Sequence, residues 1–73
     1  MRATTQDALR HMVKSSDKTA AQVSRDMGKS NGYLTVMLSD RRVPRADLLA
    51  RIARAYGYDL MLVGNGEVII LEG

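Results

Sequence analysis

Apolar side chains recur every three or four residues along most of the chain, which is the spacing of amphipathic helices. The pattern predicts four helices, over about residues 5–15, 19–27, 30–38 and 45–56. After Gly57 it changes to two short apolar runs, over about 58–63 and 67–72, which favour strands. The expected fold is therefore mainly α, with four to five helices in a single domain followed by a C-terminal β-hairpin.

The second and third predicted helices are short and closely spaced. Thr19-Ala20-Ala21-Gln22 is a capping box, in which the Thr hydroxyl and the Gln amide pair with backbone amides at a helix start. Gly28 then suits the positive φ that often ends a helix, and Ser30 suits the N-cap of the next one. Two short helices joined by a glycine-containing turn are typical of a helix-turn-helix.

The third predicted helix has two different faces. Leu34, Met37 and Leu38 lie on one side of a helical projection and are expected to be buried. The opposite side carries small or polar residues: Gly32, Thr35, Val36 and Ser39. No acidic residue occurs between Asp26 and Asp40. A face of this kind fits insertion between the phosphates of a DNA major groove.

Charge is distributed unevenly around the net value of +3. Residues 1–56 carry eleven basic and five acidic residues, a net charge of +6. Residues 57–73 carry three acidic residues, Asp59, Glu67 and Glu72, and no basic one. The longer, basic part suits a polyanionic partner, and the hairpin does not.

The residue content argues against an enzyme. The chain has no cysteine, which excludes a disulfide scaffold, a thiolate zinc site and a Cys nucleophile. It has one histidine, His11. It also lacks a phosphate-binding loop and a paired-carboxylate arrangement, so we expect no catalytic residue, no metal and no cofactor. No apolar run approaches the length of a membrane span, and no signal peptide is evident. These features predict a soluble, cytoplasmic protein without a membrane partner.

Residues 19–58 resemble the lambda-repressor-like (Xre/Cro-type) helix-turn-helix family. That family has Thr at the start of its second helix, Gly nine residues later and Ser at the start of the recognition helix, which are Thr19, Gly28 and Ser30 here. The basic loop ending in Pro44 and the amphipathic helix after it also match. Three positions depart from the pattern: Ala20 stands in place of a phosphate-contacting Gln, Leu38 in place of Glu, and Asp40 in place of a loop glycine.

The resemblance implies that double-stranded DNA is read by five residues: Asn31, Gly32, Tyr33, Thr35 and Val36. The Asn31 amide could pair with adenine, and the Thr35 and Val36 methyl groups could contact thymine. Gly32 would permit close approach, and Tyr33 would contact phosphate or sugar. The alternatives are an ordinary first-turn role for Asn31 and boundary packing for Tyr33.

Phosphate contacts are expected from residues at helix ends and in the basic loop, because such contacts position a protein on DNA. The expected set is Lys18, Thr19, Lys29, Ser30, Ser39, Arg41, Arg42 and Arg45. Arg45 could alternatively reach the minor groove. Arg51 and Arg54 lie further along the last helix and are expected to be solvated.

The two C-terminal apolar runs flank Asn65-Gly66, a dipeptide typical of type I′ hairpin turns. This turn would give the hairpin two apolar faces. One face carries Leu60, Leu62, Ile69 and Leu71 and is expected to pack on the chain's own helices. The other carries Met61, Val63, Val68 and Ile70 and is expected to form the interface of a homodimer. The alternatives are that some of these side chains stay exposed, or that both faces are buried internally.

The sequence thus predicts a homodimeric transcriptional regulator, a repressor of the Cro type, that occupies a palindromic operator. It would work in the nucleoid of a bacterial or phage-infected cell. An antitoxin, whose hairpin holds a toxin, is a second possibility that also involves DNA. A protein-interaction module in which the helix-turn-helix is only a scaffold is a third.

Overall fold

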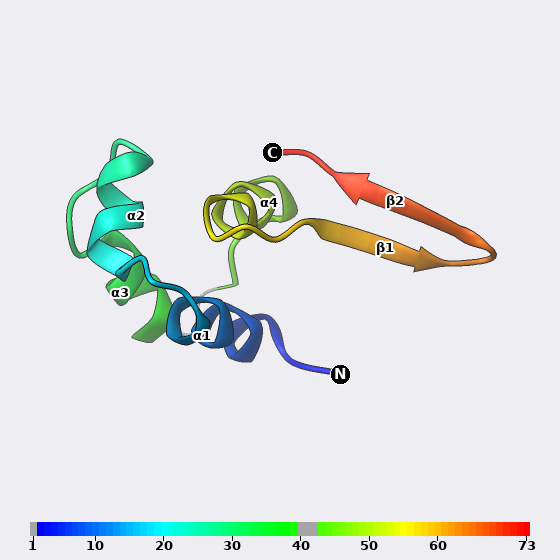
Figure 1. Cartoon of the computed structure of the whole chain (residues 1–73), viewed down its shortest axis with the longest axis horizontal. Helices are drawn as coiled ribbons and strands as arrows, with labels where there is room; N and C mark the ends of the chain where they lie inside the picture. Colours follow the sequence, from blue (N-terminus) through cyan, green and yellow to red (C-terminus); the bar gives the residue numbers. More distant parts are fainter. Residues whose placement is uncertain (1, 40–42) are drawn as a thin grey trace. The chain divides into compact units, whose positions relative to one another are not determined.

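The computed structural model describes residues 2–39 and 43–73 of the chain. Figure 1 shows the order of the elements, four helices followed by two strands. They are α1 (Thr5–Ser15), α2 (Ala20–Asp26), α3 (Tyr33–Ser39), α4 (Ala46–Ala55), β1 (Leu60–Gly64) and β2 (Glu67–Leu71). This confirms the predicted fold class. The chain forms two compact units, residues 1–43 and 44–73, so the single domain expected from its length stays a prediction.

The first unit contains α1, α2 and α3. The Oγ1 of Thr4 accepts a hydrogen bond from the amide of Asp7 (3.1 Å) and so caps the start of α1. Four apolar side chains that helical spacing turns inward are buried: Leu9 and Met12 of α1, Val23 of α2 and Leu34 of α3. Met37 and Leu38 of α3, which were also expected to be buried, are only half-buried. This unit therefore has a small apolar core to which all three helices contribute.

The predicted capping box of α2 is present. Thr19 Oγ1 accepts from the amide of Gln22 (3.1 Å), and Gln22 Oε1 accepts from the amide of Thr19 (2.8 Å). After α2 the backbone turns at Gly28, whose φ of +76° explains why glycine is needed there. The amide of Lys29 donates back to the carbonyl of Ser24 (2.9 Å), which closes the turn.

Helix α3 begins at Tyr33, so the predicted start at Ser30 is wrong by three residues. Residues 31 and 32 form a turn instead, and the amide of Tyr33 donates to the carbonyl of Ser30 (3.1 Å). Asn favours turns, and glycine weakens a helix because it has more backbone freedom to lose. Asn31 and Gly32 therefore precede the recognition helix and are not part of it.

The second unit contains α4 and the hairpin. Ala50, Ile52, Ala53 and Tyr56 are buried along one side of α4. Gly57 ends the helix with a φ of +83°, and the amide of Tyr58 donates to the carbonyl of Ala53 (2.8 Å) in a Schellman arrangement. Among the described residues, no helix combines the length and apolarity that crossing a bilayer requires.

The hairpin has the predicted turn and register. Asn65 and Gly66 both have positive φ (52° and 75°), and Val63 pairs with Val68, one pair further from the turn than Gly64 and Glu67. The expectation that one face packs on the chain's own helices is wrong for most of its length. Leu62 is 57% exposed and Ile69 47%, and only Leu60 and Leu71, at the base of the hairpin, are half-buried. The strands extend past the ten-residue helix α4, as Figure 1 shows, so both faces lie open.

Candidate nucleic-acid interface

Four of the five residues predicted to read bases lie on one short exposed surface. Asn31 and Gly32 in the turn and Thr35 and Val36 on α3 are all exposed, whereas Leu34 between them is buried. Val36 is the most unusual member, because a valine that is 60% exposed leaves most of its apolar surface in water. We call these four residues, together with Tyr33, the reading surface.

Tyr33 is half-buried at the first position of α3. The ammonium of Lys29 lies over its ring, 5.5 Å from the ring centroid, at a distance typical of a cation–π contact. The structure thus joins a predicted phosphate contact, Lys29, to a predicted reading residue. The ring of Tyr33 is partly packed and partly accessible, so both of its predicted roles remain compatible with its position.

The predicted phosphate contacts in the first unit are exposed. Lys18 and Thr19 precede α2, Lys29 and Ser30 lie between α2 and α3, and Ser39 ends α3. The hydroxyl of Thr19 accepts its capping bond and keeps a proton to donate. The hydroxyl of Ser39 instead donates to the carbonyl of Val36 (3.1 Å), so contact with phosphate would require that bond to break.

The remaining predicted contacts belong to the basic loop. Arg41 and Arg42 lie outside the described residues. Arg45 is the N-cap residue of α4 in the second unit, and its side chain is 87% exposed. Its guanidinium pairs with the carboxylate of Asp47 (3.6 Å), a solvent-exposed ion pair of the kind that contributes little to stability. Arg45 is therefore available to a partner at small energetic cost.

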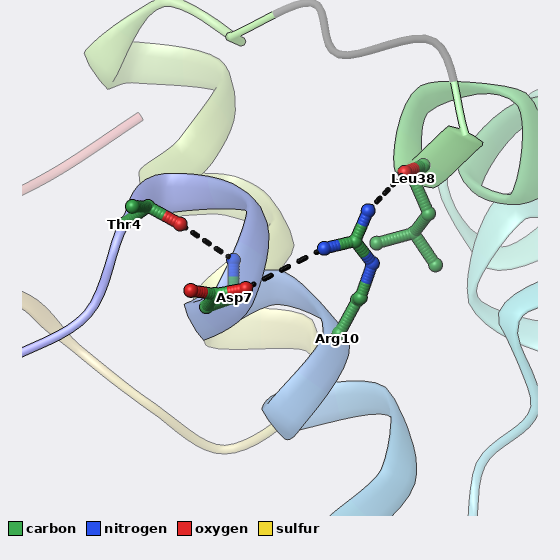
Figure 2. A network of polar contacts seen from close by, with 4 residues as sticks. All are labelled: Thr4, Asp7, Arg10 and Leu38. Carbon is green, nitrogen blue, oxygen red and sulfur yellow. Dashed lines mark hydrogen bonds and ion pairs between the residues drawn. The ribbon is translucent and has the colours of Figure 1, made fainter.

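Two polar residues that the sequence pattern did not single out contact α3. Ser24 of α2 accepts a hydrogen bond from the amide of Leu34, and Arg10 of α1 donates one to the carbonyl of Leu38. Figure 2 shows Arg10 between Leu38 and Asp7, which in turn is held by the capping bond to Thr4. A serine at an inward position of α2 was the only sequence signal for the first contact. The second had no signal except that Arg10 lies three residues after Asp7.

A short, acid-free reading surface carried by the turn and the second helix of a helix-turn-helix is typical of a DNA-binding class of protein. Residues 7–63 match the family described as helix-turn-helix domain, and the chain belongs to that family. The match confirms the resemblance predicted from Thr19, Gly28 and Ser30. Proteins of this class bind duplex DNA and regulate transcription, and they are typically not enzymes. DNA is therefore the partner of this chain.

The chain matches no curated protein and no solved structure closely enough for a comparison.

Proposed function

We propose that this chain is a homodimeric transcriptional repressor of the Cro type that acts by occupying a palindromic operator. The observation that carries the proposal is the reading surface, which lies on a helix-turn-helix and has no acidic residue between Asp26 and Asp40. The major groove, about 12 Å wide, admits one helix whose outward side chains do not repel phosphate. Helix α3 meets that condition.

Each residue of the reading surface has a proposed part in recognition. Asn31, exposed in the turn just before α3, pairs its amide with an adenine edge, because the N-terminal end of a recognition helix approaches the bases. Thr35 and Val36 present methyl groups to thymine, which accounts for the exposure of Val36. Gly32 lets the backbone come close, and Tyr33 contacts sugar or phosphate beside Lys29.

Basic and hydroxyl groups around this surface hold the DNA backbone in the proposed complex. They are Lys18, Thr19, Lys29, Ser30, Ser39, Arg41, Arg42 and Arg45. Each phosphate that they neutralise makes the slope of log K against log salt more negative by about 0.9. Binding is therefore expected to weaken steeply as salt is added, and an affinity independent of salt would contradict this set of contacts.

The hairpin is proposed to join two copies. Met61, Val63, Val68 and Ile70 lie on one face and are all exposed, and a two-stranded hairpin with an open apolar face is marginally stable alone. Covering this face with the same face of a second copy gives a two-fold symmetric dimer. Its two recognition helices would meet successive turns of the major groove, about 34–36 Å apart.

Selection of bound sequences from a random DNA library tests this function. Enrichment of a palindrome with half-sites about one helical turn apart would support recognition, symmetry and dimerisation together. Failure to enrich any sequence, at low salt and micromolar protein, would contradict sequence-specific binding. Reporter expression from a promoter that carries the selected site then distinguishes a repressor from an activator. We place this activity in the cytoplasm, at the nucleoid of a bacterial or phage-infected cell.

An antitoxin is the second candidate, and one observation favours it. A second copy covers one face of the hairpin, whereas Leu62 and Ile69 on the other face are also exposed, and the hairpin segment carries three acidic residues and no basic one. A basic toxin with an apolar groove could cover that second face. Mass spectrometry of the complex purified from its native cell distinguishes the two, because an antitoxin carries a second, different chain. The family match favours either function over a protein-interaction module that does not bind DNA.

A further inference from the structure

Helix α3 is too short to define its own geometry. It has seven residues and no charged side chain, and an isolated helix of that length is not stable in water. Its orientation must therefore come from contacts with its neighbours. Apolar packing of Leu34 supplies one such contact, but apolar contacts are non-directional and tolerate rotation of a helix about its axis. Directional contacts are needed at its ends.

The first directional contact is at the start of α3. Ser24, on α2, is fully buried with an exposed fraction of 0%. Its Oγ donates to the carbonyl of Ala20 (2.7 Å) and accepts from the amide of Leu34 (3.1 Å). The amides of a first helical turn have no partner within their own helix. Ser24 therefore caps α3 from a different helix, and the bond to Ala20 fixes the direction of its hydroxyl.

The second directional contact is at the end of α3. Nη2 of Arg10 donates to the carbonyl of Leu38 (3.3 Å), one of the last carbonyls of the helix. Nη1 of the same guanidinium lies 3.5 Å from the carboxylate of Asp7, a solvent-exposed ion pair that favours this position of the side chain only weakly (Figure 2). A positive charge at a helix C-terminus is also favoured by the helix dipole. Helix α3 is thus tied to α2 at its start and to α1 at its end.

We propose that Ser24 and Arg10 are positioning residues for DNA recognition. They hold α3 at the rotation about its axis and the depth in the major groove that contact with the DNA bases requires. The proposal rests on the function proposed above. It assigns these residues no contact with a base. Their loss should reduce discrimination between operator and random DNA, because base contacts depend on alignment within a few tenths of an ångström, whereas attraction to phosphate does not.

The test for Ser24 compares Ser24→Ala with Ile52→Val, a core variant in α4 chosen for a similar fall in melting temperature. Affinities are measured for the selected operator and for random DNA of the same length. For Ser24→Ala we expect the ratio of the two affinities to fall about tenfold, with faster amide hydrogen exchange at Leu34. For Ile52→Val the ratio should not change. An unchanged ratio in Ser24→Ala, or an equal fall in both variants, would overturn the positioning role.

The test for Arg10 compares Arg10→Gln and Arg10→Lys with Lys14→Gln, which removes the same charge from an exposed position on α1. We expect Arg10→Gln to lower the affinity ratio, Arg10→Lys to restore most of it, and Lys14→Gln to leave it unchanged. If Arg10→Gln instead weakens binding to all DNA equally and reduces the salt slope by about one, Arg10 contacts phosphate and the proposal is wrong.

The wild-type measurement distinguishes a failure of the proposed function from a failure of the positioning role alone. If the wild-type protein itself does not distinguish any selected sequence from random DNA, the proposed function fails, and the positioning role with it. If the wild-type protein discriminates and the variants do so equally well, only the positioning role fails.

Discussion

Two buried hydroxyl groups, those of Ser24 and Tyr56, differ in whether they have hydrogen-bond partners. The hydroxyl of Ser24 uses its proton and a lone pair in hydrogen bonds to two backbone groups. The hydroxyl of Tyr56, at the end of α4, is buried without a hydrogen-bond partner among the described residues. Burial raises the pKa of Tyr56, because a phenolate would lose its solvation there. The first hydroxyl therefore stabilises the fold, and the second is expected to cost stability.

Tyr56→Phe should leave stability at neutral pH unchanged or raise it by about 1 kcal/mol, because it removes an unpaired buried hydroxyl. The pKa of Tyr56 is higher in the folded than in the unfolded chain, so the phenol ionises more readily in the unfolded chain and the folded state loses stability as pH rises above about 10. The fall in stability above that pH should be smaller in Tyr56→Phe. Urea unfolding of both proteins at neutral and alkaline pH checks this, and a variant less stable at neutral pH would show that the hydroxyl has a partner.

At the reading surface, Asn31→Ala should relax the preference at one adenine-containing base pair, at a cost of about 1–3 kcal/mol for the selected site. Lys29→Gln is the contrasting variant, since losing a phosphate contact weakens binding to every sequence and makes the salt dependence of binding less steep. Competition binding against single-base variants of the operator separates the two outcomes. Equal losses at all positions in Asn31→Ala would mean that Asn31 is an ordinary turn residue.

At the scale of elements, the sequence predicted features that depend on neighbouring residues. The Thr19–Gln22 capping box and the Asn65-Gly66 turn each involve residues at most three apart, so local chemistry determines them. The helical pattern after Ser30 predicts a start of α3 that is too early, because the turn preference of Asn31 and Gly32 decides the local structure there. The bonds from Ser24 and Arg10 span 10 and 28 residues, and no periodicity in the sequence encodes such pairings.

Two glycines on either side of the turn provide a matched pair of variants. A Cβ would meet no atom within 4 Å at Gly28 or Gly32, but only Gly28 has positive φ. Gly28→Ala should therefore destabilise the protein by about 1–2 kcal/mol through backbone strain. Gly32→Ala should keep its stability and lose operator affinity, because its methyl group would lie where DNA approaches. Thermal unfolding and operator binding of both variants measure the difference, and full affinity in Gly32→Ala would contradict the close approach.

At the scale of the whole molecule, the hairpin stands out among the described residues for its exposed apolar side chains. Six large apolar side chains on its two faces are at least 47% exposed. The sequence identified the faces correctly but not their burial, because the pattern gives the orientation of side chains and not the reach of the neighbouring helix. The proposed dimer covers Met61, Val63, Val68 and Ile70.

Val63→Lys or Ile70→Glu should give monomers, because each buries an unpaired charge in the proposed interface. Leu62→Lys adds the same charge to the opposite face and should leave the dimer intact. Sedimentation velocity at micromolar concentration distinguishes the variants. A dimer that survives Val63→Lys and is lost in Leu62→Lys would assign the interface to the other face.

The exposed hairpin also bears on how this regulator would respond to its own supply. Two copies that meet only through small apolar arms associate reversibly, so below their dissociation constant most molecules are monomers. Filling an operator with two half-sites would then depend on the square of the monomer concentration. A modest change in synthesis or proteolysis would then be amplified at the promoter, because operator occupancy would rise more steeply than the amount of protein.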